Sequence, residues 1–405
     1  MAEPKVRFKQ EGGTSFPAWE TVPMSEVFTE ISEKNHPEMP VLSVQQGVGT
    51  VLRDSSDRNI IYDKSNLKNY KVMKKNDFII HLRSFEGGLE YSNYDGISSP
   101  AYRILRPKAI LPATFRDYFR SYDFIHNKLS VAVVGIRDGK NIDMDTFWQI
   151  PISVPCLEEQ QKIANFLSSV DVVISTSEQE VANLETQKKA VMKKIFSQKV
   201  RFKRADGSDF PEWEEKKLGD VCSKIGSGKT PKGGSEVYTQ NGVLFIRSQN
   251  VTNAMLNLAD RTCIPKSVHE GMRNTELQYL DVLLNITGAS IGRCCLFDLH
   301  EVANVNQHVC IIRLKDKQSY VPKYVEQIML SDYIQNQIWS CQNGGSREGL
   351  NFEQIGNFSF LSPCFEEQRL IADFLSNFDE AIAAAKKELE LWKELKKGLL
   401  QKMFV

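Results

Sequence analysis

The chain has 405 residues, and its 51 Lys and Arg balance 51 Asp and Glu, so neither a basic tail nor an acidic disordered chain is expected. At roughly 100–200 residues per domain, this length predicts two or three domains. A net charge of zero does not exclude a nucleic-acid partner, because a balanced total can include a basic face. The eight cysteines form no C-x-x-C pair, which argues against zinc and against a secreted disulfide framework. No long apolar run or signal pattern is present, so we expect a cytoplasmic protein without membrane contact.

The N-terminal stretch is the first half of an internal repeat. Val6–Lys9 returns as Val200–Lys203, and Phe16–Glu20 returns in part as Phe210–Glu214, both with a shift of 194 residues. Between residues 6 and 31, 11 of 26 positions are identical to the second copy. Repeats at a long period indicate two related modules in one chain.

Residues 6–155 are predicted to form a mixed domain in which short strands predominate. Phe78–His81 and Val131–Val134 read as strands, and Arg116–Leu129 reads as a short helix. Polar, basic and aromatic side chains follow its predicted turns, and such residues suit contacts with DNA bases and phosphates. The candidates are His81, Arg83, Tyr91, Asn93, Tyr94, Ser98, Ser99, Tyr102 and Arg137.

A long helix is predicted from Leu157 to about Gln198, since this stretch contains no Gly and no Pro. Its apolar residues follow a strict 4-3-4-3 spacing, which is typical of a coiled-coil seam. The seam residues that we expect to pack are Ile163, Leu167, Val170, Ile174 and Leu184.

Residues 200–363 are predicted to form a second mixed domain. The expected strands are Val243–Ile246, Val282–Asn285 and Val309–Ile312, and a helix is expected over Tyr320–Ser340. Its turns carry a second set of candidates for DNA contact. These are Lys229, Thr230, Arg247, Ser248, Gln249, Asn250, Thr287, Ser290, Arg293, Asn306, Gln307, His308 and Arg347.

The second long helix is predicted over about Phe365–Phe404 and repeats the first with a shift of 208 residues. Residues 155–171 and 363–379 share 11 of 17 positions, so about 14 residues are inserted between the repeated blocks of the second copy. The expected seam is Ile371, Leu375, Phe378, Ile382, Leu389 and Trp392. A framework that stays similar while its inserts diverge indicates two modules doing one job on different targets, although drift after an old duplication also produces divergence.

Each helix of forty residues is a rod of roughly 60 Å with one apolar stripe, which needs a partner to be stable. We expect the two helices to pair with each other in antiparallel orientation; the alternative is that each pairs with another chain. The lysines at equivalent seam positions, Lys188 and Lys396, either fix the register or extend to solvent. Because the head of the chain is equivalent to the segment that follows the first helix, we also expect neighbouring termini.

No catalytic motif is found. Gly226–Thr230 resembles a phosphate loop, but Ser stands at position 223 and Pro231 forbids the required helix. Asp209 with Glu214 and Lys216 is a weak nuclease pattern that is better explained as surface charge. The histidines show no metal-ligand spacing, and an amino-methyltransferase motif and a G-x-S-x-G motif are both absent. We therefore expect no catalytic residue, no metal and no cofactor in this chain.

The chain resembles the specificity subunit of type I restriction-modification systems over its whole length. The most specific motif is the helix start Glu158-Glu159-Gln160 followed by Ile163-Ala164, repeated as Glu366-Glu367-Gln368 and Ile371-Ala372. Leu280–Gly292 and the turn Asn306–His308 match nearly as well. The first segment matches more weakly, through Lys75–Phe78 and Gly96–Tyr102.

The resemblance implies an α+β fold with two pseudo-twofold-related mixed α/β target-recognition domains, held apart by an antiparallel coiled coil of two long helices. The expected division is 1–155 and 200–363 for the two recognition domains, with 156–199 and 364–405 for the helices. Each domain would read one half of a bipartite site on double-stranded DNA. The subunit itself would be non-catalytic and would assemble with two modification subunits that use S-adenosylmethionine and with restriction subunits that use ATP and magnesium.

Two recognition domains about one helical turn of DNA apart, roughly 34–36 Å, would face the same side of the duplex, and the long helices would set that distance. Two other classes of protein compete with this interpretation. A coiled-coil scaffold that joins two protein-binding domains would lack specific, salt-sensitive DNA binding. A self-sufficient enzyme would show turnover as a purified chain.

Overall fold

The computed structural model describes residues 4–53, 64–135, 140–343 and 349–404. The chain forms two compact units: unit 1 comprises Met1–Glu178 with Lys387–Val405, and unit 2 comprises Gln179–Lys386. Each unit therefore combines one of the predicted recognition segments with about half of each long helix. Among the described residues, no helix is long and apolar enough to cross a membrane.

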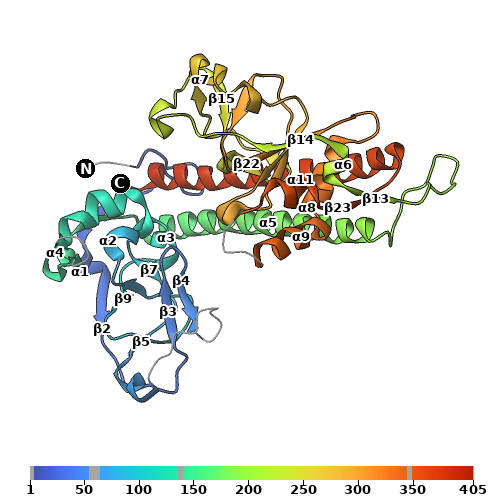
Figure 1. Ribbon diagram of the computed structural model, residues 1–405. Coiled ribbons are helices and arrows are strands. Elements are labelled where there is room, and N and C mark those ends of the chain that lie inside the picture. The colour runs from blue at the N-terminus through green and yellow to red at the C-terminus, as the bar shows by residue number, and fades with distance from the viewer. Residues whose placement is uncertain (1–3, 54–63, 136–139, 344–348, 405) are drawn as a thin grey trace. The chain divides into compact units, whose positions relative to one another are not determined.

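Unit 1 is built around an antiparallel four-stranded sheet in the order β2-β9-β6-β7 (Figure 1). Its strands are β1 Glu20–Pro23, β2 Phe28–Ile31, β3 Leu42–Gln45, β4 Gly49–Leu52, β5 Lys71–Met73, β6 Phe78–Ile80, β7 Glu90–Tyr91, β8 Gly96–Ser98, β9 Arg103–Pro107, β10 Val133–Val134, β11 Asn141–Ile142 and β12 Pro151–Val154. Its helices are α1 Met24–Val27, α2 Ser84–Gly87, α3 Pro112–Phe115, α4 Met144–Gln149 and the long α5 Leu157–Phe196, with short 3₁₀ or π turns at Lys64–Asn69, Tyr118–Arg120, Phe124–Lys128 and Leu129–Ala132.

Unit 2 contains an antiparallel sheet of the same design, in the order β14-β22-β19-β20. Its strands are β13 Glu214–Lys217, β14 Cys222–Ser227, β15 Val243–Ile246, β16 Val251–Thr252, β17 Met255–Leu256, β18 Cys263–Ile264, β19 Asp281–Asn285, β20 Cys294–Phe297, β21 Ala303–Val305, β22 Val309–Leu314 and β23 Ser359–Ser362. Its helices are α6 Leu218–Val221, α7 Lys266–Glu270, α8 Pro322–Leu330, α9 Asp332–Asn343, α10 Phe352–Gly356 and the long α11 Phe365–Met403, with 3₁₀ turns at Gly234–Val237, Ser248–Asn250, Arg273–Thr275 and Gly288–Ser290.

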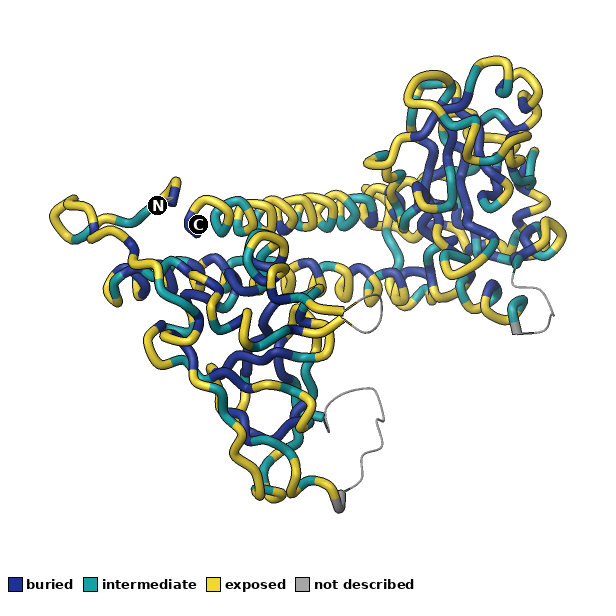
Figure 2. The backbone as a smooth tube through the Cα atoms, turned by 90° about the vertical axis from the view of Figure 1, so that its left-hand side faces the viewer, coloured by how far each residue is buried: buried dark blue, intermediate teal, exposed yellow. Residues whose placement is uncertain are grey.

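The apolar runs of the central strands are explained by burial on both faces of each sheet. In β19, Val282 and Leu284 pack into the core that contains α8, whereas Leu283 packs into a second core with β15 and β21. Because successive side chains of a strand point to opposite faces, a run without alternation is expected only where both faces are covered. Unit 1 repeats the arrangement: Phe78 and Ile79 of β6 enter different cores. Figure 2 shows that buried residues, drawn in dark blue, gather in the interior of each unit.

The repeated Glu-Glu-Gln motif clamps other parts of the chain to the start of each long helix. Glu159 accepts hydrogen bonds from Arg7, with Nη2–Oε2 at 2.7 Å, and from Trp19 Nε1 at 2.9 Å. Its side chain is fully buried. The next residue, Gln160, accepts a bond from the Leu111 N–H at 2.6 Å and donates to the Pro155 carbonyl at 2.8 Å.

Unit 2 makes the same contacts through the equivalent residues of the second repeat, including the bond from Gln368 to the Pro363 carbonyl at 2.9 Å. Glu367 is bonded by Arg201 at 2.9 Å and by Trp213 at 2.9 Å, while Gln368 holds the N–H of Val321 at 2.9 Å. A buried carboxylate needs such partners to offset its lost hydration. The repeated motif is therefore explained by docking contacts within each unit.

The two long helices pack against each other in antiparallel orientation within each unit. In unit 1, Glu178 of α5 pairs with Lys393 of α11 at 3.0 Å, and Asp171, one heptad earlier, pairs with Lys396 at 2.7 Å. As the residue number rises in α5, the partner's number falls in α11, which confirms the predicted orientation. The predicted seam residues Ile163, Leu167, Val170, Ile174, Leu184, Ile371, Leu375, Phe378, Ile382, Leu389 and Trp392 are all buried or half-buried.

The two seam lysines form equivalent ion pairs. Lys396 Nζ lies 2.7 Å from an Asp171 oxygen in unit 1, and Lys188 pairs with Asp379 in unit 2. Asp171 and Asp379 are themselves repeat equivalents, 208 residues apart. Because each ammonium contacts the facing helix and is largely buried, solvation alone does not explain its position, and the register interpretation is favoured.

The two termini of the described chain meet in unit 1. The N–H of Val6 donates to the carbonyl of Lys402 at 3.1 Å. Phe404 is buried and stacks on Tyr118 with ring centroids 4.7 Å apart. The expectation that head and tail lie together is confirmed by these contacts.

Three predicted elements differ from the structure. The expected helix Arg116–Leu129 is a series of 3₁₀ and π turns interrupted at Ser121, because the aromatic residues of this segment are buried at spacings that a single α-helix does not supply. Only the second half of the expected strand Val131–Val134 is a strand, β10; the first half ends a 3₁₀ turn in which Leu129 and Ala132, three residues apart, are both buried. The expected helix Tyr320–Ser340 is two helices.

Ser331 separates those two helices with an extended backbone. Its hydroxyl donates to the Ile328 carbonyl at 2.6 Å, and its own carbonyl accepts the Gln335 N–H at 3.0 Å. Serine therefore ends α8 and begins α9, a role that suits a residue whose hydroxyl competes for backbone hydrogen bonds.

Candidate nucleic-acid interface

Three loops of unit 2 bring four of the predicted residues into one cluster. The Thr230 hydroxyl bonds to the Gln307 side chain, and Gln307 Nε2 lies 2.8 Å from His308 Nε2. His308 Nδ1 in turn lies 2.5 Å from the Thr287 hydroxyl. Thr230 and Gln307 are exposed, as is the neighbouring Lys229. These residues follow β14, β19 and β21, so strand topology places them on one rim of the unit.

Gly228 allows the first of these loops to lie directly on the third. A Cβ atom at Gly228 would fall 1.6 Å from the carbonyl oxygen of Val305, so no other residue fits without moving the backbone. The glycine of the predicted Gly226–Thr230 loop is thus required by packing between two candidate reading loops.

A second group of predicted residues follows β15. Arg247 pairs with Asp260, with Nη2–Oδ2 at 2.7 Å, and lies 5.7 Å from the ring centre of Tyr238. The exposed Gln249 also bonds to Asp260. A guanidinium and an amide at the rim are the side chains that bind guanine and adenine edges in the major groove.

Four predicted residues are buried and do not present their side chains to a DNA surface. Asn250 accepts the Arg247 N–H at 2.9 Å and shapes the loop from within. Asn306 accepts the His308 N–H at 3.1 Å. Tyr91 bonds to Asn76 and packs on Phe78, and Ser98 lies in the interior of β8. The burial of these four side chains is decided by tertiary packing of the strands and turns to which they belong, and it gives them a supporting place inside the unit.

Asn93 is half-buried and also has a positioning role. Its Nδ2 donates to the carbonyls of Val48 at 3.3 Å and of Thr50 at 3.2 Å. Asn93 therefore supports the turn between β3 and β4. The adjacent Tyr94 is exposed and keeps its predicted accessibility.

His81 and Arg83 line a cavity of about 600 Å³ in unit 1, together with Arg103 and Lys140. Burial lowers the pKa of His81, and the nearby Glu86 acts in the opposite direction. The neutral form of the imidazole is therefore favoured near pH 7, and its Nδ1 accepts the Arg83 N–H at 3.3 Å. Arg83 is exposed beside it.

The remaining predicted residues are dispersed. Tyr102 is half-buried, and burial raises the pKa of its hydroxyl. Ser248, Ser99 and Ser290 are half-buried, and the exposed Arg293 lines a cavity of about 770 Å³ beside α5. Arg137 and Arg347 lie outside the described residues.

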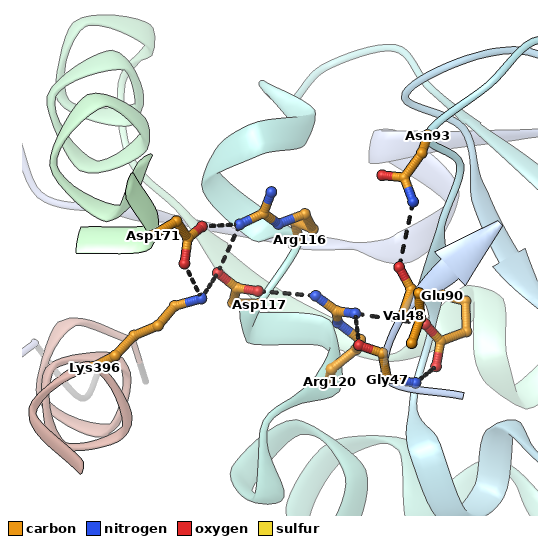
Figure 3. A network of polar contacts seen from close by, with 9 residues as sticks. All are labelled: Gly47, Val48, Glu90, Asn93, Arg116, Asp117, Arg120, Asp171 and Lys396. Carbon is orange, nitrogen blue, oxygen red and sulfur yellow. Dashed lines mark hydrogen bonds and ion pairs between the residues drawn. The ribbon is translucent and has the colours of Figure 1, made fainter. Parts of the chain in front are cut away.

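Sequence reasoning missed the β3–β4 turn, Gln45–Val48, all four residues of which are exposed. Figure 3 shows that Glu90, Arg120 and Asn93 hold the backbone of this turn. The Gly47 N–H donates to Glu90 at 2.7 Å, and Arg120 Nη1 donates to the Gly47 carbonyl at 2.7 Å. The only available signal was the pair of glycines, Gly47 and Gly49, which indicates a turn but not its role.

Metal ligands and reactive thiols are two features that would indicate chemistry in the described parts of the chain. No group of three His, Cys, Asp or Glu side chains there is arranged to hold a metal ion. The eight cysteines are unpaired, and burial raises the pKa of Cys222 to about 12. A thiol with a raised pKa is a poor nucleophile.

Comparison with known proteins identifies the repeated arrangement. The family model of the type I restriction modification DNA specificity domain matches the chain twice, at residues 18–186 and 211–391. The chain belongs to the type I restriction-modification DNA specificity family. The two matches coincide with the two repeats of the sequence, so the duplicated framework is a duplicated specificity domain.

Curated relatives carry the same description. The chain is 25% identical over 339 residues to the type I restriction enzyme MjaVIII specificity subunit of Methanocaldococcus jannaschii, covering 81% of this chain and 78% of that protein. It is 27% identical over 271 residues to the putative MjaX specificity subunit of the same organism, covering 64% of this chain and 60% of that protein.

Solved structures share the fold. The S subunit of a type I restriction-modification system from M. genitalium matches with a TM-score of 0.59 at 15% identity, covering 100% of this chain and 99% of that chain. A chain from a study of complex assembly and conformational transition of the type I R-M system matches with a TM-score of 0.52 at 18% identity, covering 96% and 97%. Specificity subunits of type I systems are non-catalytic DNA-recognition subunits, and membership of this family gives the present chain that role.

Proposed function

We propose that this specificity subunit reads a bipartite DNA site, with each recognition region bound to one half-site. The proposal rests on a difference between two parts of each unit. Glu159 and Glu367 make the same contacts in the two units, whereas the exposed loops of the units carry different residues. In unit 2 the rim carries Thr230, Gln307 and the Arg247 loop, whereas unit 1 presents Gln45–Val48 and the cavity beside His81. Two units with the same framework and different exposed loops suit the recognition of two different short DNA sequences.

The long helices α5 and α11 set the spacer between the half-sites and dock two modification subunits. Restriction subunits complete the complex, and S-adenosylmethionine, ATP and magnesium belong to those partners. Phosphate contacts supply much of the affinity, so binding weakens steeply with salt. The division into segments 1–155, 156–199, 200–363 and 364–405 describes these roles.

A segment exchange tests half-site reading. Residues 200–363 are replaced by the corresponding segment of another family member, and the chain is produced with its modification subunits. Methylated adenines are then mapped across a genome by single-molecule sequencing. We expect one half-site to change and the other to stay, and a change in both half-sites would overturn the proposal.

A matched deletion tests the spacer. The seven residues after Glu178 in α5 and the seven before Lys393 in α11 are removed together, which takes out both members of the Glu185–Lys386 ion pair and leaves the Lys188–Asp379 and Asp171–Lys396 pairs. Seven residues shorten a helix by about 10 Å, which corresponds to roughly three base pairs. We expect a shorter spacer with unchanged half-sites; an unchanged spacer would refute the role of the helices as a ruler.

A further inference from the structure

The β3–β4 turn of unit 1 and the Arg247 loop of unit 2 both follow a parallel strand pairing in chain order. In unit 2, β15 lies parallel to β21, and the chain leaves β15 into Arg247–Asn250. In unit 1, Val41 pairs in parallel with Ile97 of β8, and the chain continues through β3 into Gln45–Val48. Each segment thus leaves the one parallel pairing described in its unit.

A fully buried polar side chain forms a hydrogen bond with the backbone of each of these two segments. In unit 2, Asn285 of β19 donates to the Ser248 carbonyl at 2.8 Å. In unit 1, Glu90 of β7 accepts the Gly47 N–H at 2.7 Å. Different residues from different strands therefore perform the same task, which indicates that the conformation of these segments matters in both units.

The support in unit 1 is stronger than a surface turn requires. Burial raises the pKa of Glu90, against the opposing effects of the Gly47 N–H and the charge of Arg120. Arg120 lies 3.6 Å from the Glu90 carboxyl and also holds the Gly47 carbonyl, while Asn93 holds that of Val48. Hairpin turns of this length form without buried charges, and burying a carboxylate is costly.

The same polar contacts continue to the long helices of unit 1. Arg120 Nη2 donates to Asp117 at 3.0 Å, and Asp117 pairs with Lys396 of α11 at 2.7 Å. Arg116 joins Asp117 to Asp171 of α5. Figure 3 shows this continuous network from the helix pair to the turn, which fixes the turn relative to the helices of its own unit.

The exposed side chains of the turn suit an A·T base pair. Gln binds adenine N6 and N7 bidentately, and an apolar side chain contacts the thymine methyl group. Gln45 is exposed, and Val48 is 56% exposed. Gln46 instead packs on Gly87 of α2. Its side chain lies so close that a Cβ atom at Gly87 would be 2.7 Å from Gln46 Cγ.

We propose that the β3–β4 turn is a base-reading element of unit 1 that recognises an A·T pair through Gln45 and Val48, with Glu90 and Arg120 as positioning residues. This inference rests on the proposed function, since it names the reader of one half-site. It also explains why the buried Glu90 faces the turn from within the unit.

The test uses the full chain with its modification subunits and maps the methylated motif, as for the segment exchange. Gln45→Ala is expected to relax one position of one half-site, reducing the preference for A·T by about 5- to 150-fold. Gln45→Glu is expected to shift that position towards C·G, because a carboxylate accepts a bond from cytosine N4. Gln249→Ala, the matched control in unit 2, should alter only the other half-site.

Positioning is tested at the buried carboxyl. Glu90→Ala should relax the same position as Gln45→Ala, and Glu90→Gln should restore it in part, because the amide oxygen still accepts the Gly47 N–H. A purely structural role would lower the melting temperature without changing the motif. Motifs of the Gln45 variants identical to that of the unaltered chain would overturn the inference, whereas no bipartite motif from the unaltered chain would overturn the proposed function itself.

Discussion

Removing the seam lysine of unit 1 should destabilise the chain more than removing its repeat equivalent in unit 2. Lys396 bridges two carboxylates, Asp117 and Asp171, at 2.7 Å each, and its side chain is 18% exposed. Lys396→Met keeps the apolar stem and deletes the charge. The two carboxylates then share Arg116, and Asp117 alone keeps a second cationic partner, Arg120.

The magnitude follows from the ionisation of Asp117. Burial by itself would raise its pKa, but Arg116 and Lys396 lower the pKa of Asp117 from 3.8 to about 2. A shift of this size corresponds to about 2 kcal/mol of folding free energy. Because the folded pKa is depressed, that stability is present above pH 4 and is lost as the pH falls from about 4 to 2. We expect Lys396→Met to cost about 1–3 kcal/mol at pH 7, with a smaller cost in acid.

Lys188→Met is the matched control. Its partner Asp379 also accepts a hydrogen bond from Gln327 at 2.7 Å and lies 3.8 Å from Lys323. The carboxylate of Asp379 therefore keeps polar partners when Lys188 is removed. We expect a cost of about 1 kcal/mol or less, consistent with a partly compensated ion pair.

The assay is urea unfolding of the full chain at pH 7 and at pH 3, followed by far-UV circular dichroism. Hydrogen exchange of the C-terminal half of α11 then localises the loss, because the two units need not unfold together. Equal costs for the two variants, or a Lys396→Met cost that is the same at both pH values, would refute the reasoning.

Three further changes probe the clamp, the terminus and a reading loop. Glu367→Gln should lower the unfolding free energy of unit 2 by about 1–3 kcal/mol, since the buried Arg201 contact loses its charged acceptor; an unchanged urea midpoint would contradict this. Phe404→Ala should cost about 3–5 kcal/mol in unit 1, because it removes a ring stacked on Tyr118, and the loss should appear as faster hydrogen exchange there. Gly228→Ala should weaken recognition of one half-site while leaving unit 1 intact, because its Cβ would meet a backbone carbonyl of β21; a methylation motif with both half-sites intact would refute the close packing.

Local sequence was sufficient for the long helices and most central strands. The 4-3-4-3 spacing placed Ile163 and Leu167 in the seam, and β-branched or apolar runs placed β6, β15, β19 and β22. It failed where a segment is neither long nor regular. The turns after Arg116 follow a buried aromatic cluster, and a window of a few residues does not contain the neighbours that fix such spacings.

The candidate site was only partly predictable. Thr230, Gln307 and His308 were named from their residue types and meet in one cluster, although they come from loops about 77 residues apart in sequence. Asn250 and Tyr91 have the same kinds of side chain but are buried. Residue type alone does not distinguish a polar side chain that contacts a base from one that supports a loop.

The sequence by itself determined that the chain is a duplicated framework with two coiled-coil helices and divergent inserts, because identity at fixed shifts and heptad spacing are properties of the linear order of residues. The tertiary structure decided which polar groups face outward and which turn is held in place. Glu90 and Gly47 are 43 residues apart, and only the pairing of strands brings that buried carboxyl to the turn. Burial and long-range hydrogen bonding depend on the packing of the whole unit, so no local pattern encodes them.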